Sequence, residues 1–174
     1  MKKFFALFLS AFFLVSCQPQ SIVQDSSHPY TEFLDKMKNN QADLYYYIKD
    51  IDGNAIDDLI ILENTKLSVY SYENSVKLIG ERDFVTGTVR FFCSESNNYP
   101  GIFCFTAGGG INRYGYMTVK NGELSFEKLW EENYSTELQD SIDGIKELSS
   151  NNELISESKR LYEKSVDISF TSLK

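Results

Sequence analysis

The spacing of apolar residues changes along the chain, and each change predicts a different kind of secondary structure. Tyr30, Phe33, Leu34 and Met37 follow the i, i+3, i+4, i+7 spacing of an amphipathic helix over 29–39. Beyond residue 43, β-branched and aromatic runs of period two are separated by Asn, Gly and Ser, which is typical of strands. We expect these strands at 43–49, 58–63, 67–73, 76–79, 86–93, 101–106, 113–120 and 123–130.

A helical period returns near the C-terminus. Ser150 and Glu153 form an S-x-x-E capping box, and the apolar residues over 154–162 share one face of a helix of about fifteen residues. The alternation over 166–171 predicts a last strand. This order predicts an α+β fold, in which an antiparallel β-meander sheet is flanked by an N-terminal and a C-terminal helix on one face. A partial propeller-like sheet is the alternative.

Two glycine segments between predicted strands differ in what they indicate. Asn121-Gly122 favours a type I′ hairpin turn, because both residues tolerate positive φ. The run 108–110 fits neither a dinucleotide-binding loop nor a Walker loop, since it lacks the required later glycine and the Lys-Ser/Thr pair. We predict a mobile loop there.

The N-terminus has the features of a signal peptide. Lys2 and Lys3 precede an uncharged apolar stretch from Phe4 to Val15, and small Ser16 stands before Cys17. The apolar stretch is shorter than the roughly 20 residues that span a bilayer. We therefore assign residues 1–16 to a signal peptide.

The segment Leu14-Val15-Ser16-Cys17 resembles the lipobox of bacterial lipoproteins. That resemblance implies cleavage before Cys17, whose thiol then carries diacylglycerol, and a location at the extracytoplasmic face of the cell membrane. Several acyl chains on one residue give stable anchoring, whereas a single chain is marginal. Residues 17–28 are polar and read as a lipidated Cys followed by a flexible tether, which leaves 29–174 as a single globular domain. A plain secretory signal with an accidental Cys17 is the alternative, and an outer membrane is the alternative destination.

Charge narrows the range of partners. The chain has 174 residues, with 17 basic and 25 acidic side chains and a net charge of −8. Loss of Lys2 and Lys3 would reduce the basic residues from 17 to 15 against 25 acidic ones, so the net charge becomes −10. An acidic surface argues against nucleic acid as a partner, and anionic lipid headgroups repel it. The membrane is therefore expected as a partner only through the anchor at Cys17.

Two cysteines remain once Cys17 is set aside. Cys93 and Cys104 flank the loop 94–103, and both lie in apolar runs that predict strands. An even pair in an exported chain is consistent with a disulfide, and two buried free thiols are the alternative. The chain has no C-x-x-C motif, which disfavours zinc.

One segment carries candidate metal chemistry. Asp50, Asp52, Asn54 and Asp58 place oxygen side chains at positions 1, 3, 5 and 9, and the carbonyl of Ile56 stands at position 7. Calcium takes six to eight oxygen ligands, which alternate residues of a tight loop can supply. An EF-hand would also need Glu at position 12, where this chain has an isoleucine. A turn rich in Asp, Gly and Asn that only joins two strands is the alternative.

The segment resembles the integrin-type (FG-GAP) calcium loop, D-x-D-x-N-G-x-x-D-L. That resemblance implies that Asp50, Asp52, Asn54 and Asp58 are side-chain ligands of calcium. The family has Gly after the Asn, whereas this chain has Ala55. If that position requires positive φ, the Cβ of Ala55 costs roughly 1 kcal/mol.

The chain as a whole resembles short uncharacterised lipoproteins of Gram-positive bacteria that carry a Y-x-x-x-D-x-D-G-x-x-x-x-D/E-L segment, here from Tyr46 to Leu59. The resemblance implies a membrane-tethered extracytoplasmic domain. We expect a binding or interaction module with calcium as a possible stabiliser, and an unknown extracellular protein or glycan as its partner; a face of exposed tyrosines would favour it. The alternatives are a small glycan hydrolase that uses acidic residues and a structural subunit of an envelope complex. A single His and the absence of a nucleophile motif weigh against an enzyme, so we assign no catalytic residue.

Overall fold

The computed structural model describes residues 28–38, 43–84, 87–134, 142–165 and 167–174. The predicted signal peptide and Cys17 lie outside these residues. Among the described residues, neither helix is both long and apolar enough to cross a membrane. The elements are α1 Thr31–Lys38, β1 Leu44–Lys49, β2 Asp58–Glu63, β3 Lys66–Tyr72, β4 Val76–Asp83, β5 Thr88–Cys93, β6 Ile102–Gly108, β7 Ile111–Lys120, β8 Glu123–Tyr134, β9 Ile142–Glu147, α2 Asn152–Lys164 and β10 Thr171–Ser172.

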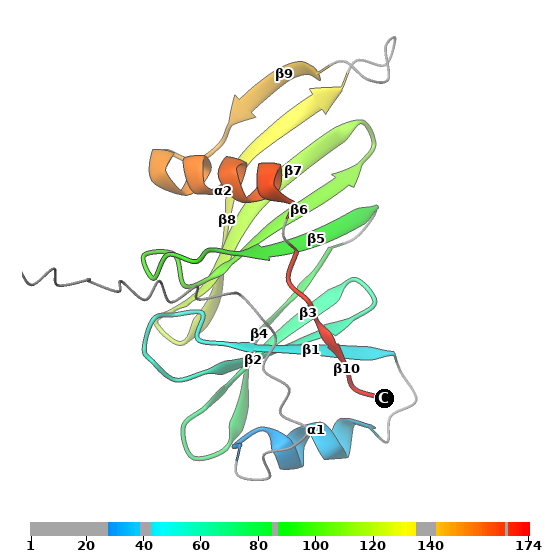
Figure 1. Ribbon diagram of the computed structural model, residues 1–174, viewed down its shortest axis with the longest axis vertical. Coiled ribbons are helices and arrows are strands. Elements are labelled where there is room, and N and C mark those ends of the chain that lie inside the picture. Colours follow the sequence, from blue (N-terminus) through cyan, green and yellow to red (C-terminus); the bar gives the residue numbers. More distant parts are fainter. Residues whose placement is uncertain (1–27, 39–42, 85–86, 135–141, 166) are drawn as a thin grey trace, which may run out of the picture.

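The expected α+β class is confirmed, but the strands form two sheets. Both are antiparallel, with strand orders β10-β1-β2-β3-β4 and β5-β6-β7-β8-β9, and Figure 1 shows them one below the other. The prediction of helices on one face of a single sheet was therefore wrong. Strands β1 and β2 are largely buried on both faces, so this part of the first sheet needs a covering layer on either side.

The inner faces of the two sheets share one hydrophobic core. Tyr47, Ile60 and Val69 of the first sheet belong to the same buried cluster as Phe91 and Met117 of the second sheet. Aromatic rings extend this contact, since Phe84 meets Phe91 edge to face with ring centroids 5.4 Å apart. This core is the interface on which the candidate site rests.

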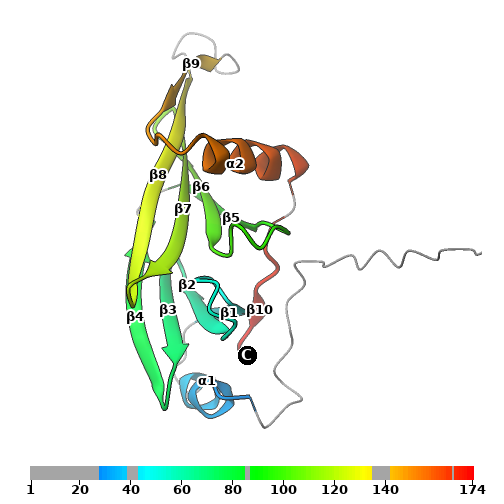
Figure 2. The same ribbon diagram turned by 90° about the vertical axis from the view of Figure 1, so that its left-hand side faces the viewer.

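Each outer face is covered by one helix. On the first sheet, Tyr30 just before α1 and Leu34 within it pack against Tyr46, Leu59 and Ile61. On the second sheet, α2 covers a cluster of aromatic and aliphatic side chains, and Figure 2 shows this helix beside the strands from the edge. The residues of that cluster include Phe92, Phe103, Phe105, Tyr114, Leu129, Trp130, Leu154, Ile155 and Leu161.

The C-terminal segment joins the two sheets. The N–H of Ile168 donates to the carbonyl of Phe91 at 2.8 Å, and the N–H of Leu173 donates to the carbonyl of Leu44 at 2.9 Å. The segment therefore passes from β5 of one sheet to β1 of the other, along the path drawn in red in Figure 1. The observed strand β10, Thr171–Ser172, overlaps the expected strand 166–171 only at Thr171, and Val166 lies outside the described residues.

Of three short motifs that the sequence analysis interpreted, the hairpin turn is confirmed, and the loop and the helix cap differ from the prediction. Asn121 and Gly122 have φ of 54° and 77°, as the predicted hairpin turn requires. The predicted loop at 108–110 is instead a tight turn, because Gly109 and Gly110 both have positive φ and directly join β6 to β7. The N-cap of α2 is Asn151, whose Oδ1 accepts from the N–H of Leu154, so Ser150 does not form the predicted capping box.

The predicted disulfide between Cys93 and Cys104 is not formed, and the free buried thiol is the correct alternative for Cys104. The two cysteines lie on neighbouring strands, but Cys93 stands opposite Ile102 and Cys104 stands opposite Phe91. They are diagonal neighbours, and diagonal residues of an antiparallel pair lie about 7–8 Å apart, too far for an unstrained disulfide.

Candidate metal centre

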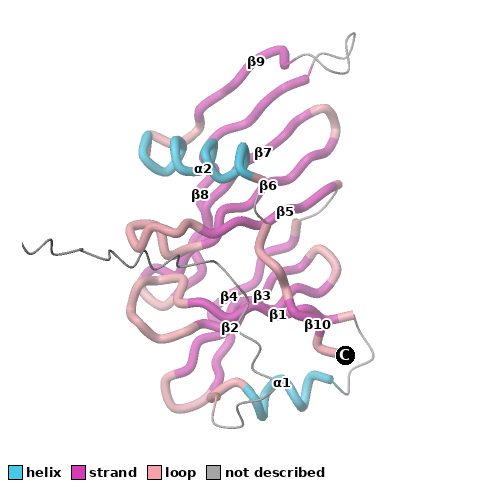
Figure 3. The backbone as a smooth tube through the Cα atoms, in the orientation of Figure 1, coloured by secondary structure: helices cyan, strands magenta, loops and turns pink. Residues whose placement is uncertain are grey.

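The acidic segment forms the loop that joins β1 to β2. The two strands pair up to Lys49 opposite Asp58, so the loop runs from Asp50 to Asp57. Figure 3 shows the loops in pink, this one at the end of the first sheet nearest the second. Ile51 fixes the start of the loop, because its side chain is fully buried in the core shared by the two sheets.

The structure brings three of the predicted ligands together. Asp50, Asp52 and Asp58 each offer one carboxylate oxygen, and these oxygens all lie within 4.8 Å of one another. Asp58 is 1% exposed, whereas Asp50 is reached by solvent. The group is therefore an acidic triad at the surface with one buried member.

Backbone N–H groups of the loop hold Asp50. Its Oδ1 accepts from the N–H of Gly53 at 2.7 Å and from that of Asp52 at 3.2 Å, and its Oδ2 accepts from Ala55 at 2.8 Å. Burial raises the pKa of Asp50, but these three N–H donors together outweigh it and leave the pKa below its ordinary value. The loop is thus built around an ionised Asp50.

The side chain of Asn54 links the loop to Asp52. Its Nδ2 donates to Asp52 Oδ2 at 3.0 Å, and its Oδ1 accepts from the N–H of Ile56 at 2.6 Å. Ile56 lies on the outer side of the loop, with half of its surface exposed. The roles of Asn54 and of the Ile56 carbonyl as calcium ligands stay predictions.

Ala55, which stands where the FG-GAP loop has Gly, has the strained positive φ that the sequence analysis considered. Its φ is +66°, in the left-handed region where a Cβ meets the backbone and Gly is favoured. The N–H of Ala55 nevertheless donates to Asp50, so the loop closes in spite of the strain. The replacement of Gly by Ala55, relative to the FG-GAP loop that the segment resembles, therefore lowers the stability of the folded loop.

Asp58 carries an electrostatic cost in the absence of a cation. Its Oδ2 accepts from the N–H of Ile51 at 3.2 Å. Burial, together with the charges of Asp52 and Asp50, raises the pKa of Asp58 to about 6. Burial also raises the pKa of Asp52, as does its neighbour Asp50. Three crowded carboxylates are mutually repulsive at neutral pH.

The residues present fit a hard divalent cation. All of the clustered donors are oxygens, which match calcium or magnesium rather than zinc or copper. The flexible geometry of calcium suits a short loop whose carboxylates are already oriented by backbone N–H groups. Burial is the main cause of the raised pKa of Asp58, and a bound cation would offset the repulsion from Asp52 and Asp50 that adds to it.

Two residues that sequence reasoning missed support this loop from a distance. Thr118 on β7 donates its hydroxyl to the carbonyl of Ile51 at 2.5 Å. The hydroxyl of Tyr30, just before α1, donates to the carbonyl of Asp57 at 2.8 Å. Neither contact has a sequence signal, because both depend on how distant elements pack.

Comparison of the chain with protein-family models, with curated proteins and with solved structures gave no match.

Proposed function

We propose that the chain is a lipid-anchored extracytoplasmic binding module, tethered at Cys17, whose Asp50–Asp58 loop holds a calcium ion. The observation that carries the metal part is the acidic triad of Asp50, Asp52 and Asp58 with its buried member. The anchor rests on the lipobox-like segment before Cys17.

The position of the loop suggests what the cation does. Ile51 joins the shared core, and its N–H and carbonyl are bonded to Asp58 and Thr118. A cation that neutralises the triad would therefore stabilise the junction between the two sheets. We interpret the ion as a structural element that stiffens the module.

We favour a binding role over catalysis because the free cysteine of the described residues, Cys104, is buried. Burial raises the pKa of the free Cys104 thiol to about 12, so this cysteine is not a nucleophile at neutral pH. Tyrosines of the strands do not form the exposed face that would favour a binding module, because four of them are buried: Tyr46, Tyr47, Tyr114 and Tyr116. The partner surface must therefore be sought elsewhere.

Thermal unfolding of the chain in EDTA and then in millimolar calcium tests the metal part. Binding to the native state alone raises its stability by RT ln(1 + [L]/Kd), about 2.7 kcal/mol at a hundredfold excess over Kd. Asp52→Asn should abolish the increase. Glu123→Gln removes a charge of the same sign from an exposed position at the start of β8 and should leave the increase intact. Equal melting temperatures in EDTA and calcium would refute the proposal.

A further inference from the structure

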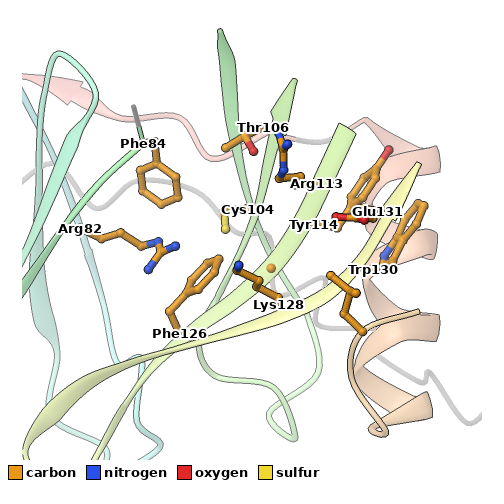
Figure 4. A pocket seen from close by; sticks show the side chains of 12 residues that line it. Arg82, Phe84, Cys104, Thr106, Arg113, Tyr114, Phe126, Lys128, Trp130 and Glu131 are labelled. Carbon is orange, nitrogen blue, oxygen red and sulfur yellow. The ribbon is translucent and has the colours of Figure 1, made fainter. Parts of the chain in front are cut away.

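A cavity of about 100 Å³ lies between the end of β4 and the strands β6 to β8 of the second sheet. Figure 4 shows Arg82 and Phe84 on one side of it, and Phe126 and Lys128 on the other. It is separate from the acidic loop, since none of Asp50, Asp52 and Asp58 lines it. Its lining combines cationic heads with aromatic rings.

Arg82 is the most unusual group in the cavity. It stands opposite Leu67, a fully buried core residue, so the strand directs its side chain inward. Its guanidinium carbon lies 3.3 Å from the centre of the Phe126 ring and 5.5 Å from that of Phe84. Its Nε is buried and has no hydrogen-bond partner among the described residues. A buried donor without a partner is costly, and an acceptor in the cavity would satisfy it.

The other charged groups around the cavity favour an anion. Arg113 and Lys128 also line it, and Glu131 is the one acidic residue of the described lining. Neither Arg113 nor Lys128 is within ion-pair distance of a described carboxylate. Three cations against one carboxylate is a local excess of positive charge, although the whole chain carries −8. Such an excess in a partly enclosed site attracts anions.

The floor of the cavity is apolar and closely packed. A Cβ on Gly115 would come within 2.4 Å of the Phe126 ring, so the absence of a side chain there lets this ring lie against β7. Cys104 lies beside it, with its thiol protonated. Phe84 closes the opposite side. The cavity therefore offers rings to the apolar part of a ligand and guanidinium donors to its charged end.

We propose that this cavity binds a small organic anion, with Arg82 donating to its carboxylate or phosphate and the rings of Phe84 and Phe126 contacting its apolar part. Arg113 and Lys128 add charge at the rim. Arginine is suited to this role because its planar fork matches both oxyanions. The proposal depends on neither the calcium loop nor the lipid anchor.

The chain supplies its own probe for the test. Trp130 is its single tryptophan, it lines the cavity, and its ring stacks on Tyr114 with centroids 3.6 Å apart. We would titrate the protein in EDTA with phenyl phosphate, benzoate, inorganic phosphate and the neutral benzyl alcohol, and follow Trp130 fluorescence. We expect a saturable change with phenyl phosphate or benzoate, a weaker one with inorganic phosphate and none with benzyl alcohol. The tighter of the two aryl anions identifies the charged group.

Variants test whether the anions bind in the cavity at Arg82. Arg82→Gln should weaken binding by at least about tenfold. Lys120→Gln loses the same charge at an exposed strand end outside the cavity and should bind as the parent does. If Arg82→Gln fails to fold, the double variant Arg113→Gln/Lys128→Gln, with both changes at exposed side chains, should show the same weakening. No saturable change below about 10 mM for any anion, or unchanged affinity in the folded variants, would overturn the proposal.

Discussion

The hydroxyl of Thr118 on β7 donates to the carbonyl of Ile51 at 2.5 Å, so the second sheet holds the acidic loop of the first. Thr118 is 6% exposed and Ile51 is fully buried, which leaves no solvent to replace this bond. The geometry of Asp58 depends on the same residue, because Asp58 accepts from the N–H of Ile51. The loop is therefore coupled to the packing of the two sheets.

Thr118→Val keeps the shape of the side chain but removes the donor. The carbonyl of Ile51 would then be buried without this partner, at a cost of about 1–2 kcal/mol. We expect chemical denaturation to show this decrease in the free energy of unfolding, and we expect weaker calcium binding. Thr88→Val, at an exposed position on β5, is the control and should change neither quantity. Unaltered calcium affinity in Thr118→Val would show that the loop is independent of the second sheet.

Ala55→Gly should stabilise the protein. The residue has a φ of +66°, which Gly adopts without the steric cost that a Cβ incurs, so we expect a gain of up to about 1 kcal/mol in the free energy of unfolding. Calcium affinity should rise with it. Ala107→Gly within strand β6 is the matched control and should destabilise the protein, since Gly weakens an ordinary strand. Lower stability in Ala55→Gly would contradict the assigned backbone conformation.

Glu157 should make α2 sensitive to acid. Arg160 donates to both of its oxygens, at 2.6 and 2.7 Å, and the hydroxyl of Ser94 also donates to it. The Arg160 bonds lower the pKa of Glu157 below its ordinary value of 4.5, and Ser94 adds to this. A lowered pKa in the folded state contributes stability above the unfolded pKa, and that stability is lost as the pH falls through the folded pKa.

Glu157→Gln should therefore destabilise the protein at pH 7 by about 1–2 kcal/mol, with the difference from the parent shrinking below about pH 4.5. Denaturant titrations at several pH values measure this difference. Glu163→Gln, on the exposed face of the same helix, should follow the parent at every pH. A pH-independent effect of Glu157→Gln would indicate a packing role instead of an ionic one.

Cys17→Ser tests the lipid anchor. The lipobox-like segment implies that Cys17 is both the cleavage point and the site of acylation, so the variant should be released to the medium or accumulate as an uncleaved precursor. Membrane fractionation of expressing cells distinguishes these outcomes from anchoring. Retention in the membrane fraction at the parent level would refute the anchor.

The fold class was accessible to sequence reasoning because local patterns determine strands and helices. The alternation over 43–130 and the helical spacings near both ends placed most elements close to their observed positions. The division into two sheets was not accessible, because it depends on which faces are buried. Strand β9 was missed, since Ile142–Glu147 is short and polar.

The two sites differ in how far sequence could predict them. The triad of Asp50, Asp52 and Asp58 lies within one loop, so its spacing alone brought the carboxylates together. The cavity at Arg82 is built from β4, β6, β7 and β8, and no local motif joins them. The sequence did contain a sign that Arg82 points inward, because strand alternation places it on the same side as Gly80 and buried Phe84.

The most direct test of the calcium site is a calorimetric titration of the metal-free protein with calcium. The account predicts saturable binding of one calcium per chain, abolished by Asp58→Asn and by Asp52→Asn and retained by Glu123→Gln. It also predicts that the affinity rises in Ala55→Gly. Absence of saturable heat in both the parent and Ala55→Gly would contradict it and leave Asp50–Asp58 as a turn that only joins two strands.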